Sequence, residues 1–181
     1  MTMEPLVVPA TQTHPVGPAD PATVVAVQEE RGQALFGFAR RLGLSDEEAS
    51  DAVQGALLRL WRELQLGTVI VRPDAWAFRA VYRVSMDEHR WRRRIERLLP
   101  RLGATRPRAA SEDPTDRLAV WAEVDLLPRR QRHVVYLRYR ADLAFEEVGT
   151  VMGISASAAR SHCTTALATL RRRFAAAEET R

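Results

Sequence analysis

The sequence predicts an all-α protein with two small helical domains joined by a flexible linker, the C-terminal domain containing a helix-turn-helix. Three observations favour this fold class. Apolar residues recur every three or four positions from Val25 to about Leu99 and again from Arg117 to about Phe174. A stretch with proline, glycine and mixed charge separates the two patterns. Nothing in the sequence resembles a strand-rich domain or an internal repeat.

The N-terminal part of the chain divides into an extension and a first helical domain. Residues 1–24 hold five of the ten prolines and little that could form a core, so we expect a disordered N-terminal extension. The first domain is expected over residues 25–99. Its helical pattern breaks at Gly43 and across residues 67–73, which predicts three helices.

Two of these helices have recognisable first turns. Ser45 is followed by three acidic residues and is expected to cap a helix that runs to about Leu66, because acids suit the positive N-terminal end. Asp74 is expected to cap the third helix, from Ala75 to beyond Arg94.

The second helical domain is expected over residues 117–175, between a linker of residues 100–116 and a tail of residues 176–181. It should begin with a helix and a short connector. The segment Ala144 to Met152 then has an apolar stripe at helical spacing, with two glutamates near its N-terminal end.

A helix-turn-helix follows from the next residues. Gly153 is expected to end the helix, since glycine readily adopts the left-handed conformation of a tight turn, and Ser155 to cap the next helix. On that helix the inward positions are Ala159, Cys163, Leu167, Leu170 and Phe174. The outward positions are Ser157, Arg160, Ser161, Thr164, Thr165, Arg171 and Arg172. Small hydroxyls and arginines on an outward face suit a helix that enters the DNA major groove. The alternative is an ordinary two-helix corner with a solvated polar face.

Charge in this chain is carried by arginine and is distributed unevenly. All 27 basic residues are arginines, and the net charge is only +4. Between Arg90 and Arg108, however, eight arginines accompany one acid, Glu96. Such local clustering is typical of a nucleic-acid-binding surface, and arginine can bind phosphate in a bidentate manner.

Several other classes of protein are disfavoured. No apolar run approaches the roughly 20 residues needed to cross a bilayer, so the sequence predicts a cytoplasmic protein without membrane association. The single cysteine, Cys163, is expected to pack rather than to act as a redox sensor. The four histidines lie in four different segments and the acids lie mostly at helix starts, so we expect no catalytic residues, no metal site and no cofactor.

Four segments resemble the motifs of one known family. DAVQGALLRLW at residues 51–61 is similar to DxVQExFLRxW, and RPDAWAFRAVYRVSMDEHRWRRR at residues 72–94 to PRAWLxxIARNxxxDxxRR. LLPRRQRHVVYLRY at residues 126–139 and AFEEVGTVMGISASAARSH at residues 144–162 are similar to LPxRQRxVxxLRY and SYEEIAxxLGISxGTVKSR. The chain therefore resembles the extracytoplasmic-function sigma factors, the smallest class of bacterial sigma factors that direct RNA polymerase to promoters.

The resemblance implies two partners, core RNA polymerase (its beta and beta-prime subunits) and promoter DNA, and it leaves room for an anti-sigma factor. The 51–61 helix would dock on the clamp helices of the largest polymerase subunit. The matching residues, expected to bind the core enzyme, are Asp51, Gln54, Leu58, Arg59 and Trp61. Gly55 replaces the acid of the motif, which removes a charge and costs roughly 1 kcal/mol of helix propensity.

The 72–94 segment would melt and read the minus-ten promoter element as a single strand. The residues expected to contact it are Trp76, Arg79, Tyr82, Arg83, Asp87, Arg90, Trp91 and Arg93. Aromatic rings, with Phe78 among them, suit stacking on unpaired bases beside arginines; the alternative is a solvated arginine face above buried aromatics, which fits Phe78 and Trp76. The Arg-Asn pair of the motif is Tyr82-Arg83 here, and because arginine only donates hydrogen bonds, the preferred base should differ.

The helix after Ser155 would read the minus-thirty-five element as duplex. The residues expected to contact it are Ser157, Arg160, Ser161, His162, Thr164 and Thr165. His162 and Thr165 stand where basic residues are usual, which should reduce phosphate contacts and the salt dependence of binding.

Two other functions fit the sequence less well. A stand-alone regulator with a helix-turn-helix would bind promoter duplex without polymerase, but it needs a dimer interface, and no long heptad seam is visible. An enzyme acting on nucleic acid would need clustered carboxylates or a nucleophile beside a base, which the sequence lacks.

Overall fold

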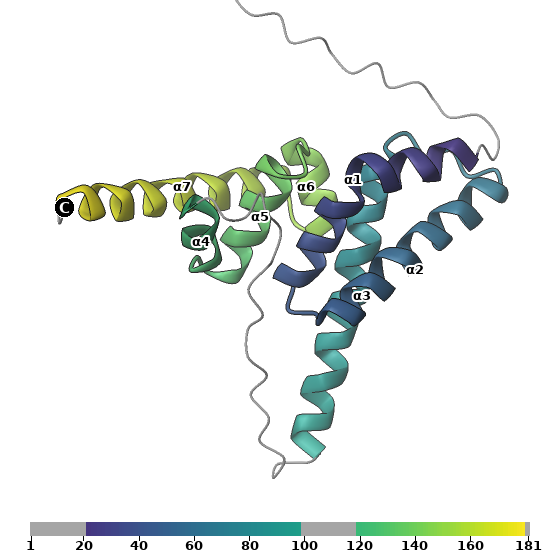
Figure 1. The fold of residues 1–181 in the computed structure, drawn as a ribbon, viewed down its shortest axis with the longest axis horizontal. Helices are drawn as coiled ribbons and strands as arrows, with labels where there is room; N and C mark the ends of the chain where they lie inside the picture. Colours follow the sequence, from purple (N-terminus) through teal and green to yellow (C-terminus); the bar gives the residue numbers. More distant parts are fainter. Residues whose placement is uncertain (1–20, 99–118, 180–181) are drawn as a thin grey trace, which may run out of the picture.

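The computed structural model describes residues 21–98 and 119–179, and these are built from helices joined by short turns (Figure 1). The helices are α1 (Pro21–Arg41), α2 (Asp46–Gln65), α3 (Pro73–Leu98), α4 (Ala119–Asp125), α5 (Arg129–Tyr139), α6 (Phe145–Met152) and α7 (Ala156–Glu179). The all-α prediction is confirmed. Within the described ranges, no helix has both the length and the hydropathy needed to cross a membrane.

The first helical unit is a bundle of α1, α2 and α3, which pack against one another in pairs. Its core contains the fully buried side chains Leu35, Phe38, Leu60, Phe78 and Val81. Burying such side chains contributes about 1.5–3 kcal/mol each, so the bundle depends on this apolar contact rather than on helix propensity.

The cap predicted at Ser45 is present. The Glu48 backbone N–H donates to the Ser45 hydroxyl at 3.3 Å, and the Ser45 N–H donates to the Glu48 carboxylate at 2.7 Å. This reciprocal pair is a capping box, and it fixes where α2 begins.

The starts of α1 and α3 differ from the prediction. The composition places residues 21–24 in the disordered extension, but α1 begins at Pro21; residues 1–20 lie outside the described residues. Helix α3 begins at Pro73, so Asp74 lies within its first turn instead of capping it. Proline suits the first helical position, because its fixed φ fits a helix and its missing N–H would have had no intrahelical partner.

The second unit contains the predicted helix-turn-helix, made of α6 and α7. Gly153 has φ +67° and ends α6, its N–H donating to the Gly149 carbonyl. The Ala158 N–H then donates to the Ser155 hydroxyl at 3.1 Å, which begins α7. Ala159, Cys163 and Leu170 are buried as predicted, whereas Leu167 and Phe174 are only partly buried.

The two units pack directly on each other. Helices α5 and α6 lie beside α1 and α3 (Figure 1), and one apolar core runs through both units. The expected linker, residues 100–116, lies outside the described residues. A separate small cluster joins α4, α5 and α7; its buried members are Val124, Leu127, Val135, Ala166 and Leu170.

Candidate nucleic-acid interface

The outer face of α2 carries the residues expected to bind core polymerase. Asp51, Gln54, Leu58 and Arg59 are exposed, while Trp61 is partly buried. Leu58 is 59% exposed and is one of several large apolar side chains that the described residues present to solvent. Because Ala56 and Leu60 face the core, helical periodicity directs these neighbours outward. Gly55 has no atom within 4 Å of where a Cβ would lie, so the acid of the family motif would fit there.

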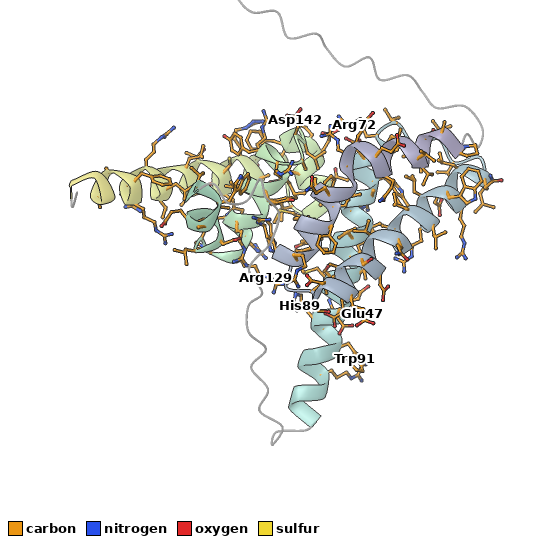
Figure 2. The ribbon with its side chains drawn as sticks, viewed as in Figure 1. Glu47, Arg72, His89, Trp91, Arg129 and Asp142 are labelled. Carbon is orange, nitrogen blue, oxygen red and sulfur yellow. The ribbon has the colours of Figure 1, made fainter. Side chains whose placement is uncertain are left out.

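The residues predicted to contact the minus-ten element divide into two groups along α3. In the C-terminal half, Arg83, Asp87, Arg90 and Trp91 are exposed. Figure 2 shows Trp91 on the part of α3 that projects away from the rest of the protein, and 60% of its surface is accessible. Arg93 also lies in α3, but its side chain is outside the described part of the structure.

Asp87 and Arg90 form an ion pair at 3.1 Å on this exposed surface. Both side chains are more than two-thirds accessible, so solvent screens the pair and it contributes little to stability. The pair leaves the Arg90 guanidinium available for exchange onto a phosphate.

The N-terminal half of the same surface is covered in part by the second unit. Trp76, Arg79 and Tyr82 are each only partly accessible. Trp76 and Arg79 line a pocket of about 360 Å³ whose opposite wall is formed by Glu146, Glu147, Thr150 and Val151 of α6. Two acidic residues of the second unit therefore stand across from a surface predicted to hold DNA.

The stacking role considered for Phe78 is wrong. Phe78 is fully buried, with its ring centroid 5.7 Å from that of Phe38 in an edge-to-face arrangement. Tyr82 also packs inward, 6.4 Å from Phe38 and 6.2 Å from the ring of His133 in the second unit. Apolar packing holds both rings. A ring face that is buried against neighbouring rings cannot also stack on a base.

The outward face of α7 is accessible as predicted. Ser157, Arg160, Ser161, Thr164 and Thr165 are exposed, and His162 is partly buried. The Thr164 and Thr165 hydroxyls donate to the backbone carbonyls of Arg160 and Ser161, both at 3.0 Å. The hydroxyl oxygens can still accept a hydrogen bond, and the short side chains allow DNA to approach closely.

Arg160 is held in place by two residues of α6. Its guanidinium carbon lies 4.7 Å from the centroid of the Phe145 ring, and Nη2 lies 3.6 Å from a carboxylate oxygen of Glu146. Stacking restricts the side chain, so less rotamer entropy is lost when it contacts a phosphate or a guanine.

Sequence reasoning missed the residues that join the two units. Tyr136 is fully buried, and its hydroxyl donates to the Ala34 carbonyl of α1 at 2.9 Å. His133 is 2% exposed and packs against Phe38 and Tyr82. Both lie at positions that the motif of this segment leaves variable, so only long-range contact identifies them.

Burial makes His133 a weak base in this position. Loss of solvation, followed by the positive charges of Arg132 and Arg129, lowers the pKa of His133 from 6.5 to about 3. The imidazole is therefore neutral at neutral pH, and its Nε2 has no hydrogen-bond partner among the described residues.

A second polar contact between the units centres on Arg72. Its guanidinium donates to the Asp74 carboxylate at 3.0 and 2.9 Å and pairs with Glu147 of α6 at 2.5 Å. Although burial opposes it, the hydrogen bonds from Arg72 lower the pKa of Asp74 below its usual value. Figure 2 shows Arg72 close to where the two units meet.

The two helical units match two known families of protein domains. Residues 28–95 match the family described as Sigma-70 region 2, and residues 124–172 match Sigma-70, region 4. The RNA polymerase sigma-E factor of Streptomyces coelicolor is 30% identical over 146 residues, which cover 81% of this chain and 82% of that protein. The chain belongs to the sigma-70 family of RNA polymerase sigma factors. Within that family it is an extracytoplasmic-function (ECF) sigma factor.

Three further proteins are similar to this chain over most of their length. The ECF RNA polymerase sigma factor SigL of Mycobacterium tuberculosis is 27% identical over 162 residues, covering 84% of this chain and 89% of that protein. In structure, the sigma factor is similar to RpoE of Bartonella quintana, solved with the anti-sigma factor NepR (TM-score 0.64, 20% identity, 83% and 93% of the two chains). It is also similar to CnrH, solved with the cytosolic domain of CnrY (TM-score 0.55, 23% identity, 87% and 90%).

Membership of this family fixes the general function of the sigma factor. It binds core RNA polymerase and promoter DNA, and it directs the initiation of transcription. The helices α2 and α3 lie in region 2, and the helix-turn-helix lies in region 4. The prediction of an alternative sigma factor is confirmed.

Proposed function

We propose that three surfaces of this sigma factor make its contacts during initiation. The outer face of α2 binds core polymerase, the exposed side of α3 holds the melted minus-ten strand, and the outward face of α7 contacts the minus-thirty-five duplex. The observation that carries this proposal is the exposure of Leu58 beside Asp51, Gln54 and Arg59 on one face of α2. A large apolar side chain ringed by polar ones suits a protein docking surface.

The minus-ten assignment is supported by the chemistry of the exposed half of α3. Arg83, Arg90 and Trp91 present guanidinium groups and an indole to solvent along one helix. Arginines attract the backbone of single-stranded DNA, and an indole stacks on any base, at about 1–3 kcal/mol per stacked base. Binding free energy of this kind would be used to hold the strand-separated state.

We propose no catalytic role for the sigma factor. Within the described ranges, no group of three histidine, cysteine or acidic side chains is placed to hold a metal ion. The sigma factor would act in the cytoplasm, because that is where core polymerase meets the promoter. An anti-sigma partner is part of the proposal, since RpoE was solved with the anti-sigma factor NepR.

Run-off transcription with core polymerase across a promoter library tests the proposal. We expect one preferred pair of minus-ten and minus-thirty-five elements. Arg83→Asn, which replaces a donor with a group that both donates and accepts, should change the preferred minus-ten base without changing core binding. Arg62→Asn, at an exposed position of α2, is the control and should leave the preference unchanged. An unchanged preference in Arg83→Asn would refute the role of Arg83.

The alternative, a stand-alone regulator, is distinguished in the same preparation. Strong and specific binding of promoter duplex by the purified chain, without core polymerase, would favour a regulator. Binding that appears only after core polymerase is added would favour the proposal.

A further inference from the structure

The outward face of α7 continues past the residues predicted to contact the minus-thirty-five element. Arg171 follows Arg160 by eleven residues, which is about three helical turns. Arg172 has the same spacing from Ser161. A step of eleven residues rotates a side chain by only about 20° around the helix axis. Arg171 and Arg172, which are both exposed, therefore lie on the same face of α7 as the predicted contacts.

Short side chains separate the two ends of this face. Thr164, Thr165 and Ala168 are exposed between Arg160 and Arg171. The middle of a helix with such residues can come close to base edges, while arginines at its ends extend further outward. The face thus has arginine at both ends and short side chains in the middle.

The C-terminal half of α7 is held firmly in the second unit. Arg173, the next residue, is directed toward α4, where its Nη1 donates to the backbone carbonyl of Glu123 at 3.4 Å and to the carboxylate at 3.2 Å. Leu170 is buried between α4, α5 and α7, and Phe174 packs against the same cluster. Helix α7 is uninterrupted (Figure 1), so the rise between Arg160 and Arg171 is about 16 Å along the axis.

The positive charges of Arg171 and Arg172 are not neutralised by the side chains that the structure describes. Arg172 donates to the Thr169 hydroxyl at 3.5 Å, and neither guanidinium has an acidic partner among those side chains. Arg160 and Arg173 differ in this respect, since each pairs with a glutamate. Two adjacent uncompensated cations attract an anionic partner.

The dimensions of this face fit double-stranded DNA. The major groove of B-DNA is about 12 Å wide and has phosphates along both walls. Arginines about 16 Å apart on one helix face can reach both walls while the short side chains lie over the bases. An acidic protein surface would also attract Arg171 and Arg172. Their continuity with the face of α7 proposed to contact duplex favours DNA.

We propose that Arg171 and Arg172 form a second phosphate-binding site for promoter duplex, on the wall of the major groove opposite the one near Arg160. The inference rests on the proposed function of α7 and extends it. This site would supply positive charge that α7 lacks at His162 and Thr165. It would add affinity without selecting a sequence, because phosphates are the same at every base pair.

Alanine variants measure the contribution of the site. The assay is fluorescence anisotropy of labelled minus-thirty-five duplex with holoenzyme at several salt concentrations. Arg171→Ala and Arg172→Ala should each reduce the salt slope by about 1 and raise the Kd by on the order of fivefold. The preferred minus-thirty-five sequence should not change. Arg173→Ala is the matched control, because it removes the same charge from the side of α7 that meets α4, and it should keep the wild-type salt slope.

Duplexes that carry one uncharged methylphosphonate locate the contacts. Wild-type holoenzyme should lose affinity at two groups of phosphates, one on each wall of the groove. Arg160→Ala should become insensitive at the first group, and the double variant Arg171→Ala with Arg172→Ala at the second. Lysines at residues 171 and 172 should keep the second group sensitive, because lysine also binds phosphate. A double alanine variant that stays sensitive at both groups would overturn the second site.

Failure of the second site can be told apart from failure of the proposed function. If neither Arg160→Ala nor the double alanine variant changes duplex affinity, the proposed role of α7 fails. If only Arg160→Ala weakens binding, the proposed function stands and the second site is overturned. A double variant that binds duplex normally but core polymerase weakly would place Arg171 and Arg172 in a protein contact, and it would also overturn the second site.

Discussion

The guanidinium of Arg41 at the end of α1 lies over the ring of Tyr136 in α5, 4.7 Å from its centroid. Arg41 is 6% exposed and also pairs with Asp125 at 3.3 Å. A cation above an aromatic face gains more when water is excluded, so this contact is stronger here than at a surface. Arg41 and Tyr136 therefore couple the folding of region 2 to that of region 4.

Arg41→Ala should destabilise the protein by about 2 kcal/mol, because it removes the cation above the ring, the pair with Asp125 and the buried stem of the side chain. Urea denaturation followed by circular dichroism measures this. Arg62→Ala, at an exposed position of α2, is the control and should change the free energy of unfolding by less than about 0.5 kcal/mol. Equal effects of the two variants would contradict a special role for Arg41.

Local signals in the sequence were sufficient for the helix-turn-helix. Gly153 adopts positive φ and Ser155 caps α7, as their residue types predicted. The exposure of Arg160 followed from helical periodicity, which placed it among the outward positions of its helix. Each of these features depends on residues within about one turn, so the sequence contains what is needed to predict them.

Contacts between the units could not be predicted in this way. Ala34 and Tyr136 are separated by 102 residues, and no spacing rule connects them. From the sequence alone, Gly37 would be expected only to lower the helix propensity of its segment. Its close approach to Tyr136 is visible only in the three-dimensional structure. For the same reason Tyr82, which was predicted to stack on a base, is found packed against Phe38 and His133.

His133 should make the folded protein less stable in mild acid. Its pKa is about 3 in the fold and 6.5 when the imidazole is fully solvated, so its contribution is complete above pH 6.5 and is lost progressively as pH falls below 6.5. Between pH 6.5 and 5.5 the loss should be about 1 kcal/mol, and between pH 7.5 and 5.5 about 1.4 kcal/mol. The groups around the imidazole are Arg129 and Arg132 on α5, the Arg41 backbone and His89 on α3, and none is an acid that would favour protonation.

Urea denaturation at pH 7.5, 6.5 and 5.5 measures this dependence. His133→Phe keeps a ring in the same space and should flatten the decline between pH 6.5 and 5.5. Asp74 does not interfere, because its lowered pKa makes its contribution fall only below about pH 3.8. A decline of equal size in His133→Phe would show that another group is responsible.

Leu58→Ala should weaken core binding without weakening the fold. The side chain is 59% exposed, and leucine and alanine have similar helix propensities, so the free energy of unfolding should change by less than about 0.5 kcal/mol. Loss of an apolar anchor from a docking face should raise the Kd for core polymerase by on the order of tenfold. Val25→Ala, 52% exposed on α1, is the control and should bind normally. Normal core affinity in Leu58→Ala would contradict the docking face on α2.

Arg160 and Glu146 should affect duplex binding in opposite directions. Arg160→Ala removes a phosphate or base contact, so in the holoenzyme we expect weaker binding of the minus-thirty-five duplex and a salt slope smaller by about 1. Glu146→Gln removes a negative charge beside the duplex and releases Arg160 from its pair, so binding should tighten. The pair itself is exposed and contributes little to stability.

Fluorescence anisotropy with holoenzyme and labelled duplex at several salt concentrations measures both effects. Glu47→Gln is matched to Glu146→Gln, since both glutamates lie in the first turn of a helix, but Glu47 is on α2 (Figure 2). Glu47→Gln should leave duplex affinity unchanged. Like Glu146→Gln, it loses the favourable interaction of a carboxylate with a helix N-terminus, but this helix end lies away from the DNA. If Glu146→Gln and Glu47→Gln changed affinity equally, the effect would come from net charge and not from the pair with Arg160.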